Sequence, residues 1–331
     1  MRETGGATDL YFDLASVTKP MMAVAAVRAG IDRRTPLGAL LAEARGTPSE
    51  EVPLELFLAH RAGLAEHRPL YAPLLRGERV DRSAALREAA AARRPDAPGP
   101  PPAGGFAPLY SDLGYALAGE AVARAVGARD AGEAVDRFVI EPLGIARQAG
   151  TVRDLEARGI EGPFAPTEDV PWRGGLVTGA VHDENAWALT GSGGSGHAGI
   201  FGTVDAVVTF GAAVLDALRD APERRGPFAT TEAGAPADLG WLVAPRPGGT
   251  LRAGFDGKSD EGSSAGAHMG VRAFGHLGFT GTSLWIDPDA AIVVALLTNR
   301  VCPSREHRAI REERPRAHDA LYERAVLLRA S

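Results

Sequence analysis

Residues 12–27 read FDLASVTKPMMAVAAV, in which a serine is followed three positions later by a lysine and then by an apolar run. Pro20 has no backbone N–H and is best tolerated in the first turn of a helix, where the donors have no partner within the helix. The run therefore predicts a buried helix that ends before Gly30 and begins near Ser16. Residues three apart share a helix face, so the hydroxyl of Ser16 and the amine of Lys19 are expected to meet.

The lysine is unusual in this chain. Of its 36 lysines and arginines, only Lys19 and Lys258 are lysine. Arginine stays protonated, whereas a partly buried lysine can be pushed toward neutrality and accept a proton. With so few lysines, chance would produce only ~0.07 serine-x-x-lysine matches. The pattern favours an activated serine nucleophile beside the free N–H groups of a helix start, and the alternative of a capping serine followed by a surface lysine stays open.

Composition sets limits on partners and location. The 331 residues are 45% hydrophobic and 24% charged, which is typical of a soluble globular protein with one large domain or two smaller ones. A net charge of −6 with no basic block argues against nucleic acid or an anionic membrane as a partner. The single cysteine, Cys302, excludes an internal disulfide and a cysteine-rich metal site. With neither an apolar signal core at the start nor a run long enough to span a bilayer, the sequence predicts a cytoplasmic protein, unless the true N-terminus is missing.

The first third of the chain reads as helical, and residues 150–200 read as loop-rich. Helical patterns extend to Leu40, from 83 to 94 and from 113 to 126, and a Pro/Gly connection over 95–108 cannot be helical. The glycine cluster at 191–199 lacks the lysine of a phosphate loop and is interpreted as a flexible loop.

The last third predicts strands between two helices. The helices are expected near 204–219 and over 305–330, and the strands at 239–243, 279–286 and 291–298. The last two strands should form an antiparallel hairpin through Asp287-Pro288-Asp289.

Two further segments carry groups that a serine nucleophile needs. Tyr110-Ser111-Asp112 follows the proline-rich connection directly, which can hold a tyrosine hydroxyl in a cleft. Taken alone, the segment is more typical of a helix start capped by Ser111 or Asp112. Residues 275–281 read GHLGFTG and are expected to open the strand that continues to Ile286, with His276 otherwise an ordinary surface histidine.

Together the three segments resemble the serine β-lactamase and penicillin-binding-protein superfamily, in its class C-like esterase branch. Tyr110-Ser111-Asp112 is similar to the Y-x-N element, and His276-Leu277-Gly278 stands where K-T-G is usual. The segments LAHRAGL at 58–64, EPLGI at 141–145, VHDEN at 181–185 and GHAGIF at 196–201 add to the resemblance, which covers nearly the whole chain.

The resemblance implies roles for individual residues. Ser16 would be the acylated nucleophile, Lys19 its base or proton relay, and Tyr110 the partner in proton transfer to the leaving group. The backbone N–H groups of Ser16 and Phe279 would form the oxyanion hole. Asp112, His276 and Gly278 would contact the substrate. Asp112 replaces the usual asparagine, which adds a charge and removes an amide donor. The neutral form of His276 dominates at pH 7.5, so acidification toward pH 6 should restore a cation for carboxylate-bearing substrates.

The implied fold is α/β, with an antiparallel sheet flanked by helices and a mostly helical insertion. We expect one domain over 1–331, with the α/β part at about 1–50 and 200–331 and the insertion at about 51–199. Relatives place two strands before the nucleophile, whereas fifteen residues precede Ser16 here. A late start codon, a fragment or a reduced form whose exposed sheet edge needs a partner would each account for this, the last through a homo-oligomer.

The sequence thus predicts a serine hydrolase that acts through an acyl-enzyme on a carboxylic ester or a related small acyl compound. The alternatives are a D-amino-acid peptidase, a β-lactamase, and a sensor or binding module of the same fold without turnover. No cofactor is expected. Zinc at His182 and His197 is disfavoured against a hydrogen-bonded loop, because their spacing fits no known zinc site.

Overall fold

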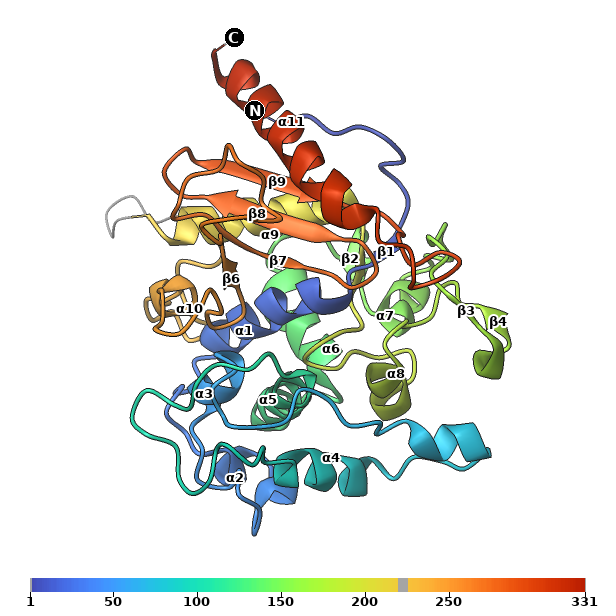
Figure 1. Cartoon of the computed structure of the whole chain (residues 1–331), viewed down its shortest axis with the longest axis vertical. Coiled ribbons are helices and arrows are strands. Elements are labelled where there is room, and N and C mark those ends of the chain that lie inside the picture. The colour runs from blue at the N-terminus through green and yellow to red at the C-terminus, as the bar shows by residue number, and fades with distance from the viewer. Residues whose placement is uncertain (1, 220–225, 331) are drawn as a thin grey trace.

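The computed structural model of the protein describes residues 2–219 and 226–330 (Figure 1). Its main sheet has four antiparallel strands in the order β6-β7-β8-β9. They span Asp256–Gly257, Phe274–Leu277, Ser283–Asp287 and Ile292–Leu296. The hairpin expected at Asp287-Pro288-Asp289 is present, with Asp287 opposite Ile292. The fold is the mixed α/β arrangement with an antiparallel sheet that the sequence predicted.

Helices cover both faces of this sheet. Leu284 and Ile286 of β8 belong to the large core, which also contains Phe210 of α9 (Val204–Ala217). Trp285, between them in the strand, points the other way and packs with Tyr322 of α11 (Ile310–Ala330). Successive side chains of a strand face opposite sides, so two covering layers leave β8 buried along its whole length.

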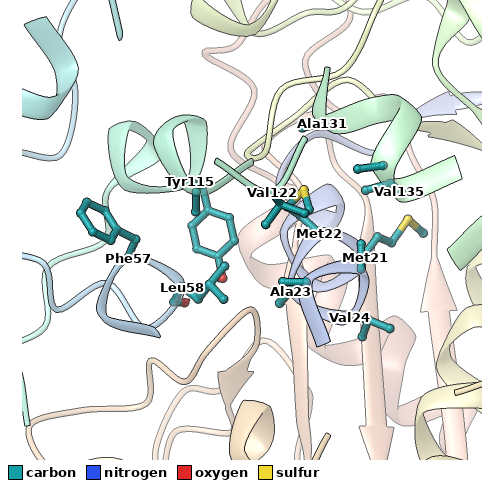
Figure 2. Close-up of a cluster of buried hydrophobic side chains, with 14 of the residues drawn as sticks. Met21, Met22, Ala23, Val24, Phe57, Leu58, Tyr115, Val122, Ala131 and Val135 are labelled. Atoms are coloured by element: carbon teal, nitrogen blue, oxygen red, sulfur yellow. Dashed lines mark hydrogen bonds between the residues drawn. The ribbon is translucent and has the colours of Figure 1, made fainter. Parts of the chain in front are cut away.

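The predicted first helix runs through the middle of the molecule. The short turn η1 (Ala15–Val17) leads into α1 (Thr18–Arg28), in which Met21, Met22 and Val24 are fully buried. Figure 2 shows these side chains between Tyr115 and Val122 on one side and Val135 on the other. An apolar helix with no polar face is stable only when it is enclosed in this way.

A mostly helical region lies beside α1. Its helices are α2 (Leu37–Leu40), η2 (Ala42–Ala44), α3 (Leu54–Leu58), η3 (Ala72–Arg76), α4 (Arg82–Ala91), α5 (Asp112–Ala125), α6 (Ala131–Val135), η4 (Asp136–Ile140), α7 (Val152–Ala157), η5 (Pro171–Arg173) and α8 (Glu184–Thr190). Short strands β1 (Phe12–Asp13), β5 (Phe201–Gly202) and β2 (Ala149–Gly150) pair in that order, and β3 (Asp169–Val170) pairs with β4 (Gly175–Leu176). The pairing of β1 with β5 brings the segment before Ser16 next to the glycine cluster.

Two sequence predictions about strands were wrong. Residues 239–243 form the short helix α10 (Gly240–Val243) instead of a strand, because a five-residue apolar run buries Leu242 equally well in either conformation. The predicted single strand from 275 to 286 is two strands, β7 and β8, which are joined by a turn over 278–282. His276 and Leu284 are therefore paired across the sheet.

The glycine cluster is also different from the flexible loop that the sequence suggested. Residues 193–200 are buried, and a Cβ at Gly196 would overlap the backbone of α5 at Tyr115 and Gly119. These glycines allow the loop to lie directly on the helix, so they serve close packing. No helix within 2–219 and 226–330 has the length and apolarity needed to cross a bilayer.

Candidate active site

Ser16 and Lys19 meet as their spacing predicts. The Lys19 ammonium donates to the Ser16 hydroxyl over 2.8 Å, and Lys19 is fully buried whereas Ser16 is partly exposed. Ser16 lies in η1, immediately before α1, so its side chain stands at the start of the central helix. A reachable hydroxyl is thus held against a buried amine.

Two further acceptors complete the surroundings of the Lys19 amine. The carboxylate of Asp112, the first residue of α5, lies 2.6 Å from Nζ, and the backbone carbonyl of His197 lies 3.4 Å away. Burial alone would lower the pKa of Lys19, but Asp112 and Tyr110 outweigh it and the pKa lies above its ordinary value. The expectation that burial pushes this lysine toward neutrality was therefore wrong, because the sequence could not show that a carboxylate would be in contact with it.

Tyr110 lies against the same amine. Its ring centre is 4.8 Å from Lys19 Nζ, and its hydroxyl interacts with both Lys19 and Ser16. Burial raises the pKa of Tyr110, so the phenol is protonated at neutral pH. His60 stacks on the tyrosine ring, with centroids 4.6 Å apart, and its Nδ1 accepts from the Ser111 amide over 3.0 Å. The histidine thereby fixes the position of Tyr110.

The turn before the nucleophile is held by a buried carboxylate. Asp13 accepts from the amide of Ala15 over 2.8 Å and from the amide of His182 over 2.7 Å. Ala15 has a left-handed φ of 47°, a conformation that costs a non-glycine residue about 1 kcal/mol. Asp13 therefore stabilises a sharp turn that presents Ser16, and links this turn to the segment that leads into α8.

The turn between β7 and β8 is attached to the same segment. Thr280 donates to the Asp13 carbonyl over 2.7 Å, and Thr282 donates to the Leu14 carbonyl over 3.0 Å. A side chain at Gly278 would overlap Thr282 and the Leu14 carbonyl, so only glycine allows this approach. In the part of the chain that the structure describes, the amides of Ser16 and Phe279 donate to no protein acceptor. Two free donors thus lie on two segments that are in direct contact.

His276 is in β7 and is buried, with 5% of its surface exposed. Its Nδ1 donates to the Leu277 carbonyl over 2.8 Å, and its ring lies 6.0 Å from that of Tyr110. Burial, together with the nearby Lys19 cation, lowers the pKa of His276 to about 3. The prediction that acidification to pH 6 would protonate this histidine was therefore wrong, because it assumed a surface site.

His182 and His197 both lie in segments that are held by side-chain hydrogen bonds. His197 Nε2 lies 2.9 Å from the Asp183 carboxylate, and Ser195 lies 3.0 Å from its Nδ1. His182 contacts the Glu168 carboxylate at 3.0 Å. Within the described residues no three side chains of the metal-binding types gather at one point. The Asp183–His197 contact holds the glycine-rich loop so that the His197 carbonyl faces Lys19.

The structure thus brings together Ser16, Lys19, Tyr110, Asp112 and His276, and places the backbone of Gly278 and Phe279 beside Ser16. It adds supporting residues that the sequence did not assign, namely Asp13, His60, Asp183, His197, Thr280 and Thr282. The sequence carried signals for several of them. Asp13 precedes the nucleophile and His60 lies in LAHRAGL, whereas Asp183, His197 and Thr280 lie in VHDEN, GHAGIF and GHLGFTG. Chemically, the arrangement offers a hydroxyl nucleophile, a proton-carrying amine, a phenol and two free N–H donors.

A family model identifies the family of this chain, and solved structures share its fold. The sequence model of the family described as Beta-lactamase matches residues 4–317. Among solved structures, a beta-lactamase from Mycobacterium bovis (Mb2281c) has a TM-score of 0.59 and 21% identity, with 97% of this chain and 90% of that chain covered. EstCE1, described as a hydrolase with promiscuous acyltransferase activity, has a TM-score of 0.62 and 18% identity, with 93% and 85% covered. An octameric penicillin-binding protein homologue from Pyrococcus abyssi has a TM-score of 0.62 and 16% identity, with 97% and 66% covered. A search of curated proteins found no relative.

Proposed function

The chain belongs to the beta-lactamase family, whose members are generally serine hydrolases, and from this premise we propose that it hydrolyses carboxylic esters through an acyl-enzyme on Ser16. The observation that carries the choice of an ester is the neutral, buried His276. The family's third motif usually offers a lysine, a permanent cation suited to a substrate carboxylate. A histidine whose pKa is about 3 offers no charge at neutral pH, which favours substrates without a carboxylate.

Acylation begins when the neutral form of Lys19 takes the proton of the Ser16 hydroxyl, which lies 2.8 Å away. The serine oxygen then attacks the ester carbonyl carbon, and the carbonyl oxygen becomes an oxyanion that accepts from the amides of Ser16 and Phe279. The ammonium formed on Lys19 stays paired with Asp112.

Collapse of this intermediate breaks the bond to the alcohol, which needs a proton as it leaves. Tyr110 interacts with both Ser16 and Lys19, so its phenol can donate that proton and recover one from the ammonium. Lys19 is then neutral again. A water molecule repeats the sequence on the acyl-enzyme and releases the acid, and Ser16 recovers its hydroxyl.

Labelling tests the nucleophile. We expect a fluorophosphonate probe to modify Ser16, as located by mass spectrometry, and a fluorescent penicillin to label it far more slowly. Steady turnover of a chromogenic acetate ester would establish hydrolysis. A burst without turnover would indicate an acylated sensor, and no burst at all would indicate a binding module.

The two lysines provide a matched pair of variants. Lys19→Arg keeps the charge but loses the base, so ester turnover should fall ~10²–10⁴-fold. Lys258→Arg should stay close to wild type, because among the described residues Lys258 donates only to the backbone carbonyls of Ala267 and Met269. Thermal melting checks that both variants fold. If folded Lys19→Arg keeps more than about a tenth of the activity, Lys19 is not the base.

A further inference from the structure

Three aromatic side chains from separate segments gather beside the site. Tyr71, just before η3, stacks on Trp172 of η5 with ring centroids 5.8 Å apart, and Trp172 lies 5.9 Å from Trp187 of α8. Trp172 is 38% exposed. All three segments lie on the side of the molecule shown at the right of Figure 1.

Hydrogen bonds connect this cluster to the catalytic groups. The loop that leads to Tyr71 begins at the site, where the Glu66 carbonyl accepts from the Asp112 amide over 3.1 Å. Helix α8 also begins there, because its cap Asp183 contacts His197. Asn185, in the first turn of α8, joins both parts by accepting from the Tyr71 amide over 3.2 Å. The aromatic cluster therefore extends from the wall of the site.

Other exposed apolar side chains lie on the same segments or on segments that adjoin or contact them. Phe279 is 47% exposed and stacks on His182, which precedes the cap of α8, with centroids 5.7 Å apart. Leu176 of β4 is 52% exposed, and Leu75 of η3 is 53% exposed. Among the described residues eight large hydrophobic side chains are exposed, and half of them lie on these segments. Apolar side chains that gather in this way mark a binding site more often than chance exposure.

We propose that an apolar rim, made of Tyr71, Trp172, Leu176 and Phe279, binds an aromatic group of the ester substrate. This inference rests on the proposed function, because the rim is useful only beside a working nucleophile. Aromatic rings favour offset or tilted stacking on other rings, and the exposed face of Trp172 offers such a surface. A cationic group is disfavoured at the Phe279 ring, since the guanidinium of Arg300 already lies 4.4 Å from its centre.

Three esters of alkyl alcohols test whether the rim binds an aromatic ring on the acyl side or on the alcohol side of the substrate. Ethyl acetate has no ring, ethyl phenylacetate carries it on the acyl side, and 2-phenylethyl acetate carries it on the alcohol side. We expect the wild-type protein to have a higher kcat/KM for one phenyl ester than for ethyl acetate. Trp172→Ala should reduce that preference about 3- to 10-fold through KM and leave ethyl acetate unchanged. The ester affected identifies the side that occupies the rim.

Leu327→Ala is the matched control, because Leu327 is 63% exposed on α11, outside the rim. It should leave all three values unchanged. Tyr71→Ala should act like Trp172→Ala if the two stacked rings form one surface. The proposal is overturned if both rim variants keep the wild-type preference to within about twofold.

Binding without turnover separates this proposal from the proposed function. In a Ser16→Ala background, calorimetric titration with the two phenyl esters measures affinity directly. Saturable binding that weakens about 3- to 10-fold with Trp172→Ala supports the rim even if the wild-type protein turns over no ester. If the wild-type protein turns over esters but Ser16→Ala binds the phenyl esters equally well with and without Trp172→Ala, the hydrolase function stands and the rim is rejected.

Discussion

Replacement of Asp112 by asparagine removes one charge and keeps an oxygen that can accept from Lys19. The carboxylate lies 2.6 Å from the amine, and the amine is fully buried. A neighbouring opposite charge shifts a pKa by about 1–3 units, which corresponds to about 1.4–4 kcal/mol. We therefore expect Asp112→Asn to lower the pKa of Lys19 by that amount.

The consequence for the rate follows from the proton that Lys19 must accept. Only the neutral amine is a base, and the raised pKa makes this form scarce at neutral pH. In the wild-type protein, kcat/KM should therefore rise about tenfold per pH unit from about pH 6 to 9. In Asp112→Asn this rise should move about 1–3 pH units lower. A weaker base also transfers the proton less readily, so we expect a net gain of ~3- to 30-fold at pH 7.

Hydrolysis of a chromogenic acetate ester between about pH 6 and 10 measures this shift. The control is Glu66→Gln, which removes an exposed carboxylate from the loop that touches the Asp112 amide. Glu66→Gln should leave the pH dependence of kcat/KM unchanged. A rise that stays at the wild-type pH in Asp112→Asn, or moves higher, would refute the reasoning that Asp112 controls the protonation of Lys19.

Three further expectations follow. Because the pKa of His276 is about 3, this residue should stay neutral from about pH 8 to 5, and the ratio of kcat/KM for a carboxylate-bearing ester to that for a neutral ester should stay constant. His276→Lys should raise this ratio about tenfold. A ratio that climbs on acidification of the wild-type protein would contradict the expectation. The pKa of Glu168 is lowered to about 2, and its carboxylate lies 2.6 Å from Arg305, so the ion pair stabilises the fold above the ordinary pKa of a glutamate and is lost as pH falls toward 2. Arg305→Ala should lower the free energy of unfolding in urea by about 1–3 kcal/mol at pH 7 and by clearly less at pH 3. An equal loss at both pH values would count against this ion pair. The edge strand β9 contains neither proline nor charge, so we propose that the protein self-associates along it. Ala295→Lys should shift the mass measured by light scattering toward that of the monomer, whereas Ala91→Lys, at an exposed position of α4, should not. An unchanged mass in both variants would exclude this edge.

Local patterns in the sequence predicted the parts that depend on nearby residues. The three-residue spacing of Ser16 and Lys19 placed their side chains together, and the turn at 287–289 located the final hairpin. The pKa of Lys19 could not be predicted, because it depends on a carboxylate 93 positions away. The burial of His276 was missed for a similar reason. Its strand is short and glycine-containing, so its pairing with β8 shows only in the folded sheet.

The hydroxyls of Thr280 and Thr282 join two segments that lie more than 260 positions apart in the chain. They fasten the backbone that carries the Phe279 amide to the backbone that presents Ser16. The donors proposed for the oxyanion are therefore preorganised, and little reorganisation is needed when charge develops on the substrate. The entropy of bringing these distant segments together is lost once, when the chain folds, and each catalytic cycle begins from an already ordered arrangement.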